Sequence, residues 1–366
     1  MGNSEEQGIQ VQRMNDALKD ILVKTDSLLI GYSGRVSKPL LPPVSFSAGR
    51  GEMIAVAGRN GSGKSTLLKT LAGILKPLGG TIYIDGKDMT KFKRTELALK
   101  TGFVATGDVK VPGMKVSELV KLGRYPHTSW TGTLDDHDYS RVEYAIESTG
   151  LRNLCERYVE ELSDGERQRA MIGRVVAQDT PLIILDEPTA FLDIKSRYEI
   201  TDLLRRLAEE EGRTVIFSTH DLQSVFGICG RMLLLTEKEV AEGAPEDLAL
   251  NGTLNLLFDD PGLKFNPEDA TVSFLRQMTG TVQVTGAEGA VRLWTCRTVQ
   301  RTGFHPVSTE APLRIEIRDG SQERKWICRN KENSEEVILE NLYDTGKWLG
   351  EQKKQHDRSS QRLNFL

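Results

Sequence analysis

The sequence has no long apolar run and little net charge. None of its apolar stretches approaches the ~18 residues that a membrane helix needs. The opening MGNSEEQGIQVQR lacks the basic and then apolar pattern of a signal peptide. A net charge of −4 over 366 residues gives no reason to expect nucleic acid as a partner. We therefore expect a cytosolic enzyme or binding protein with two or three cores.

Cysteine is also scarce. The four cysteines are far apart in the chain and form no CxxC pair: Cys155, Cys229, Cys296 and Cys328. This spacing predicts a reducing compartment, and neither a disulfide framework nor a cysteine metal site.

The chain divides by pattern into three parts. A polar extension covers 1–25 and contains one weakly helical piece, 14–24. The main part, 26–260, includes a more polar and helical stretch at about 91–165, and it repeats strand, helix, strand. Its apolar runs PLIILD and TVIFST are too short for helices and predict strands buried on both faces. Between them, a helix carries one apolar stripe, so we expect a mostly parallel sheet.

The third part, 261–366, differs in composition and predicts a small separate α+β domain. Residues 313–329 alternate like two strands of a hairpin about Asp319-Gly320. Residues 334–349 are typical of a capped helix.

A glycine-rich segment, GRNGSGKST, follows the apolar strand EMIAVAG and precedes a helix. It fits G-x-x-x-x-G-K-[ST], the loop whose backbone N–H groups surround a phosphate. A chance match has a probability of roughly one in a hundred, so we expect nucleotide binding rather than an ordinary turn. The predicted nucleotide-binding residues are Gly58, Arg59, Asn60, Gly61, Ser62, Gly63, Lys64, Ser65 and Thr66.

Two later strands end in polar side chains. LIILDEPT places Asp186 and then Glu187 at a strand end, where Asp186 and Ser65 suit Mg²⁺ and Glu187 suits a base that polarises water. STHDL places His220 at the end of the next strand, within reach of a γ-phosphate. Outside this context, an Asp-Glu strand end or a lone histidine is more often structural.

The stretch LSDGERQRA predicts a helix start with a capping box. Ser163 would cap the first turn, and Glu166 would reach back to the Ser163 amide. Asp164 and Glu166 add negative charge beside a helix end that suits an anion. We expect both carboxylates to turn away; the alternative is that Arg167 or Arg169 neutralises them.

Taken in order, GRNGSGKST, LSDGERQ, LIILDEPT, AFLD and STHD resemble the motifs of ATP-binding cassette (ABC) transporter subunits. The resemblance covers about 60% of the chain and implies a P-loop α/β fold with a helical subdomain. It implies that Tyr32 stacks on adenine and that Asp193 communicates across a homodimer. In that dimer, Ser163, Asp164, Gly165 and Glu166 of one copy would face the ATP held by the other.

The segment LGRYPHTSWTG resembles the ATPases of iron–siderophore, haem and cobalamin importers, and other segments resemble a sub-branch of Bacteroidetes-type bacteria. This implies a peripheral subunit on the cytoplasmic side of the inner membrane. Its partners would be polytopic permease subunits and, indirectly, a periplasmic binding protein. Residues 106–131 would meet the permease through exposed side chains, although a solvated helix end has the same character: Lys121, Arg124, Tyr125, His127 and Trp130.

One position departs from the family. Thr106 stands where these ATPases carry glutamine, and a threonine hydroxyl is shorter by about two bonds. It can act only through closer approach or a bridging water.

Two questions stay open. The alternative to an importer subunit is a soluble ABC ATPase without a transport role. The domain 261–366 is either a regulatory module or a passive dimerisation lobe.

Overall fold

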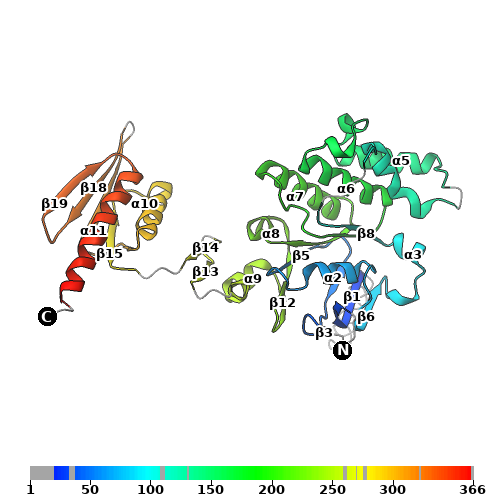
Figure 1. Cartoon of the computed structure of the whole chain (residues 1–366), viewed down its shortest axis with the longest axis horizontal. Helices are drawn as coiled ribbons and strands as arrows, with labels where there is room; N and C mark the ends of the chain where they lie inside the picture. The colour runs from blue at the N-terminus through cyan, green and yellow to red at the C-terminus, as the bar shows by residue number, and fades with distance from the viewer. Residues whose placement is uncertain are drawn as a thin grey trace, which may run out of the picture. The chain divides into compact units, whose positions relative to one another are not determined.

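The structure is a computed structural model that describes residues 20–32, 38–107, 112–129, 132–258, 262–268, 270–274, 278–320 and 323–363. The chain forms two compact units, one of residues 1–260 with 264–272 and one of 261–263 with 273–366 (Figure 1). Most of the predicted N-terminal extension, 1–19, lies outside the described residues. In the described part of the chain, no helix combines the length and hydropathy needed to cross a membrane.

A six-stranded sheet forms the centre of the first unit, in the order β12-β11-β5-β10-β9-β8. Five of its strands run parallel, and β12 closes one edge antiparallel to β11. As predicted, the PLIILD and TVIFST runs are strands buried on both faces. The bounds are β5 (Met53–Gly58), β8 (Thr101–Val104), β9 (Leu182–Leu185), β10 (Thr214–Thr219), β11 (Arg231–Leu235) and β12 (Val240–Gly243).

A second, antiparallel sheet has the order β4-β1-β6-β7. Its strands are β1 (Ile21–Leu29), β4 (Ser47–Gly49), β6 (Gly79–Ile84) and β7 (Lys87–Asp88), with β2 (Gly31–Tyr32) and β3 (Lys38–Pro39) paired separately. The helix predicted over 14–24 is wrong at its end, because Ile21–Lys24 belong to β1. Leu22 and Val23 are buried there.

Alternate residues of β5 face two different cores. Met53 and Ala55 pack with the helices α6, α7 and α8, whereas Ile54 and Val56 pack with α2 and the antiparallel sheet. Figure 1 shows α2 and α6–α8 on opposite sides of the sheet. The helices are α2 (Lys64–Leu71), α3 (Arg94–Ala98), α4 (Val116–Lys121), α5 (Asp136–Ser148), α6 (Asp164–Gln178), α7 (Ile194–Glu209), α8 (Leu222–Ile228) and α9 (Pro245–Leu250).

Short 3₁₀ helices link several of these elements: η1 (Met89–Lys91), η2 (Leu122–His127), η3 (Arg152–Leu154), η4 (Val159–Glu161) and η5 (Thr253–Leu257). Helices α4, α5 and α6 pack against one another. The predicted helical stretch 91–165 contains α3, α4 and α5, but it also contains β8, which is the edge strand of the central sheet.

The strands β13 (Leu263–Asn266) and β14 (Thr271–Phe274) pair with each other. Phe265 of β13 is buried in the core of the first unit and stacks on Phe226, with ring centroids 5.9 Å apart. The first unit therefore depends on residues beyond 260.

The second unit is a mixed five-stranded sheet with two helices, in the order β16-β15-β17-β18-β19. The hairpin predicted about Asp319-Gly320 is confirmed as β17 paired with β18. The helix predicted over 334–349 is wrong in its first part, because Glu335–Leu339 form β19 against β18, and the helix begins at Leu342. The bounds are β15 (Thr281–Thr285), α10 (Gly289–Arg301), β16 (His305–Val307), β17 (Leu313–Asp319), β18 (Arg324–Asn330), β19 (Glu335–Leu339) and α11 (Leu342–Leu363).

Candidate functional site

The glycine-rich loop joins β5 to α2 and turns through two left-handed glycines. Gly61 and Gly63 have φ values of 81° and 96°, which side-chain-bearing residues rarely adopt. There is no room for a side chain at Gly58, because a Cβ there would lie 2.5 Å from Ser62 Oγ. The Ser62 hydroxyl is buried and has no hydrogen-bond partner within the described chain. An orphaned donor in a loop of this shape fits a phosphate acceptor.

Lys64 is 5% exposed and curls back over this loop. Its ammonium donates to the carbonyls of Gly58 at 2.9 Å and Arg59 at 3.1 Å, and it lies 3.9 Å from Glu187 Oε1. Burial lowers the pKa of Lys64, and the carboxylates of Glu187 and Asp186 partly oppose this shift. The cation is thus held at the mouth of the loop, where an anionic ligand would complete its partners.

Asp186 follows β9, and its carboxylate accepts hydrogen bonds from two hydroxyl groups. Its Oδ1 accepts hydrogen bonds from Ser65 at 2.9 Å and from Ser218 at 2.8 Å. A carboxylate and a hydroxyl that meet beside a phosphate loop are the hard oxygen donors that Mg²⁺ uses together with phosphates and water. The residues present therefore fit the ion.

Glu187 and His220 lie at the ends of the neighbouring strands β9 and β10. His220 Nε2 lies 2.8 Å from Glu187 Oε1. Glu187 adopts φ +49°, a left-handed conformation that is uncommon for a residue with a side chain. Strained backbone of this kind clusters at functional sites. The structure brings both predicted catalytic residues together with Lys64.

Thr106 lies just after β8, beside the same strand end. Its hydroxyl donates to the main-chain carbonyl of Asp186 at 2.7 Å. The side chain therefore contacts the backbone that leads into Glu187, a partner that the sequence did not indicate.

The capping box at the start of α6 is present. Ser163 is the N-cap and accepts from the Glu166 amide at 3.4 Å, while Glu166 Oε2 accepts from the Ser163 amide at 2.9 Å. This confirms that Glu166 turns back onto the cap. The hydrogen bond from the Ser163 amide lowers the pKa of Glu166.

Asp164 behaves differently from Glu166. Its side chain is exposed and forms an ion pair with Arg167 at 3.1 Å, so neutralisation by arginine, the alternative that we disfavoured, applies here. Gly165 is buried against α7, where a Cβ would lie 2.5 Å from Ser196 Oγ. The glycine therefore has a packing reason besides any contact with a ligand.

Asp193 caps the start of α7. Its carboxylate accepts from the Ser196 amide at 2.8 Å, and this hydrogen bond lowers the pKa of Asp193. The preceding Phe191 is 87% exposed and has φ +62°. Tyr32, the predicted adenine platform, is 64% exposed, and its hydroxyl lies 3.3 Å from Thr66 Oγ1. It stands beside the first turn of α2, next to the loop.

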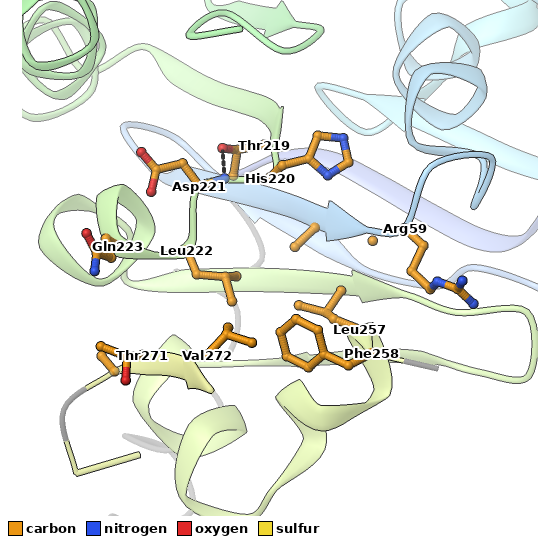
Figure 2. A pocket seen from close by; sticks show the side chains of 13 residues that line it. Arg59, Thr219, His220, Asp221, Leu222, Gln223, Leu257, Phe258, Thr271 and Val272 are labelled. Carbon is orange, nitrogen blue, oxygen red and sulfur yellow. Dashed lines mark hydrogen bonds between the residues drawn. The ribbon is translucent and has the colours of Figure 1, made fainter. Parts of the chain in front are cut away.

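A pocket of about 450 Å³ borders the loop and the end of β10. Figure 2 shows His220 and Arg59 near one side of it and apolar side chains on the other, among them Leu222, Phe258 and Val272. The pocket extends the candidate site beyond the phosphate-binding loop.

The surface expected to meet a membrane partner needs one correction. Arg124 is 1% exposed, and its guanidinium forms an ion pair with Asp138 at 2.8 Å and donates to Ala177 O at 2.9 Å. It therefore holds η2, α5 and α6 together and cannot contact a partner. Tyr125 is 72% exposed, and Lys121 and His127 are also exposed; Trp130 lies outside the described residues.

Sequence reasoning missed Ser218. The residue is fully buried in β10, donates to Asp186 Oδ1 and accepts from the Glu187 amide at 2.8 Å. A serine directly after the apolar residues VIF, inside the predicted strand TVIFST, was the available signal.

Comparisons with known proteins agree with this geometry. Residues 41–190 match the family model described as ABC transporter. The chain is 37% identical over 227 residues to the probable siderophore transport system ATP-binding protein of Bacillus subtilis. The aligned region covers 62% of this chain and 82% of that protein. It is 36% identical to the ferric enterobactin transport ATP-binding protein of Escherichia coli, over 58% of this chain and 81% of that protein.

The chain belongs to the ATP-binding subunits of ABC transporters. It is therefore an ABC ATPase that binds and hydrolyses ATP. Residues 279–349 match a second family model, described as iron ABC transporter C-terminal domain. No comparison supports the Bacteroidetes sub-branch that the sequence suggested.

Two solved ABC structures are similar to the chain. One is an inward-facing putative metal-chelate type ABC transporter, with a TM-score of 0.57 and 30% identity over 65% of this chain and 89% of that one. The other is a dimeric ATP-binding cassette in a post-hydrolysis state bound to ADP and Pi, with a TM-score of 0.54 and 29% identity over 61% of this chain and 99% of that one. ABC cassettes related to this chain thus form dimers and occur in transporter complexes.

Proposed function

We propose that this ABC ATPase energises a membrane importer for an iron–siderophore, haem or cobalamin compound. The observation that carries the catalytic part is the convergence of Lys64, at the start of α2, with the residues that follow β9 and β10, which are Asp186, Glu187 and His220. The iron ABC transporter match over residues 279–349 and the siderophore-transport relatives support the substrate class.

The roles of the side chains follow from their positions. The loop 58–66 would surround the triphosphate, with Lys64 as its cation. Ser65 and Asp186 would hold Mg²⁺, which neutralises phosphate charge when it is bound. Glu187 would accept a proton from the attacking water, and His220, 2.8 Å from it, would orient Glu187 and contact the γ-phosphate.

A second copy of the chain would complete the site. The start of α6 presents the Ser163 hydroxyl and the positive end of a 15-residue helix, which suit a γ-phosphate held by the other copy. Because Asp164 pairs with Arg167 and Glu166 pairs with the cap, their charges are partly offset at that face. The dimeric cassette among the similar structures supports this arrangement.

The importer would place this subunit on the cytoplasmic face of the inner membrane. The exposed side chains of Lys121, Tyr125 and His127 would meet the permease, and a periplasmic binding protein would deliver the compound. The second unit, 261–366, would serve as a regulatory module or as a passive dimerisation lobe.

Uptake tests the transport proposal. The native gene is replaced by the Lys64→Ala variant, and uptake of radiolabelled ferric siderophore, haem and cobalamin is compared with that of the parent strain. We expect loss of uptake of one of the three compounds. Normal uptake of all three would contradict the importer role.

A further inference from the structure

The peptide bond between Asp186 and Glu187 is held by two hydroxyl groups, one from the segment that follows β8 and one from β10. On one side, Thr106 Oγ1 donates to the Asp186 carbonyl at 2.7 Å. On the other, the Glu187 amide donates to Ser218 Oγ at 2.8 Å. The carbonyl and the N–H of a trans peptide point in opposite directions, so the two contacts fix the orientation of its plane.

This peptide lies where the regular sheet ends. The pairing of β9 with β8 and with β10 stops at Leu185 on both sides. The Asp186 amide still donates to Val104 O at 2.9 Å. Beyond that point, Thr106 and Ser218 take the place of strand partners and extend the restraint by one peptide, up to Glu187.

The restraint acts on a strained residue. Glu187 has φ +49°, and such a conformation persists only when surrounding contacts hold it. In this conformation the Glu187 carboxylate lies 2.8 Å from His220 and 3.9 Å from Lys64. The Ser218 hydroxyl also donates to Asp186 Oδ1. The same hydroxyl thus contacts both the carboxylate of Asp186 and the main chain of Glu187.

We propose that Thr106 and Ser218 are positioning residues that clamp the Asp186–Glu187 peptide and so aim the Glu187 carboxylate at the attacking water. The threonine at the position where the family carries glutamine then acts on the backbone of the catalytic base. This inference rests on the proposed function, because the clamp can affect catalysis only if Glu187 is the base.

The test compares Thr106→Val, which keeps the shape and removes the hydroxyl, with Thr106→Ser, which keeps the hydroxyl. Thr236→Val is the matched control, because the Thr236 hydroxyl also donates to a main-chain carbonyl, at 2.8 Å, in the turn between β11 and β12. Steady-state ATP hydrolysis gives kcat and KM for each full-length variant.

Loss of one such hydrogen bond predicts a fall in kcat of about five- to tenfold in Thr106→Val, with KM changed by less than twofold. Thr106→Ser and Thr236→Val keep kcat within twofold of the parent. A kcat within twofold in Thr106→Val, or an equal loss in Thr106→Ser, would overturn the clamp.

Amide hydrogen exchange of Glu187 in the nucleotide-free protein gives a readout that does not depend on turnover. We expect Ser218→Ala to exchange this amide at least about fivefold faster, since its acceptor is gone. An unchanged exchange rate would contradict the role of Ser218.

A Glu187→Gln variant separates the two proposals. If it is inactive while Thr106→Val is normal, the clamp alone fails. If it turns over at the parent rate, Glu187 is not the base, and the catalytic role proposed for Glu187 fails together with the clamp.

Discussion

The ion pair of Arg124 with Asp138 gives a stability prediction whose size follows from burial. The side chains are 1% and 7% exposed, and two guanidinium nitrogens lie 2.8 Å from Asp138 Oδ1. Replacing Arg124 by methionine leaves a buried carboxylate without its charge partner and the Ala177 carbonyl without a donor. Breaking such a pair costs about 3–5 kcal/mol, so we expect Arg124→Met to lower stability by that amount.

Calorimetry of the full chain measures the effect. The unfolding transition of the first unit is the one that moves to higher temperature when ATP is added. For that transition, a loss of about 3–5 kcal/mol in stability lowers the Tm by roughly 6–20 °C. The control is Arg205→Met, whose ion pairs with Asp202 and Glu209 lie on the exposed side of α7 and contribute at most about 1 kcal/mol. A loss below about 1 kcal/mol in Arg124→Met would refute the reasoning.

The pH dependence of this effect has a definite sign. Burial raises the pKa of Asp138, but hydrogen bonds from the Asp135 amide and Arg124 outweigh it, so the pKa lies below its ordinary value. The stabilisation is therefore complete above the unfolded pKa of about 3.9 and is lost as the pH falls through the lower folded value. We expect the difference between the parent and Arg124→Met to shrink in acid.

Three further predictions concern the proposed ATPase cycle. Lys64→Ala should weaken ATP binding at least tenfold in calorimetric titration, because it removes the cation beside the phosphates; unchanged affinity would contradict that role. Asp164→Gly should change ATP-driven dimerisation less than threefold in sedimentation, since the Asp164 side chain is exposed and paired with Arg167; a large gain in dimer affinity would mean that its charge faces the phosphate. Removal of residues after Phe274, which spares Phe265 in the first core, should leave ATPase activity within twofold if the second unit is a passive lobe; altered activity or transport would support regulation.

The sequence predicted the parts of the fold that depend on local pattern. The strands β9 and β10 and the apolar stripe of α7 follow from short-range periodicity, as does the capping box of Ser163 and Glu166. The motif order placed Lys64, Asp186, Glu187 and His220 in one site because the ends of parallel strands meet at one sheet edge. In each case the physical cause lies within a few residues or within a known spacing.

The predictions that were wrong depend on contacts that the spacing of residues in the sequence does not indicate. The sequence pattern of residues 335–339, taken together with the residues after them, predicts a helix. Pairing with β18 makes Glu335–Leu339 a strand instead. Arginine is usually exposed, yet the Arg124 side chain is buried because it forms an ion pair with the buried Asp138 carboxylate. The contacts of Asp186 and Glu187 with Thr106 and Ser218 cross 80 and 31 residues of sequence and depend on strand order, so no local pattern indicates them.

Turnover by Glu187→Gln tests the central claim most directly. The amide keeps the size of the side chain and removes its basicity, so we expect ATP binding within threefold of the parent and a kcat at least about 100-fold lower. In the presence of ATP and Mg²⁺, the variant should also accumulate as a dimer in size-exclusion chromatography. Parent-level turnover, with no dimer formed, would contradict the assignment of Glu187 as the base of an ATP-driven, two-copy site.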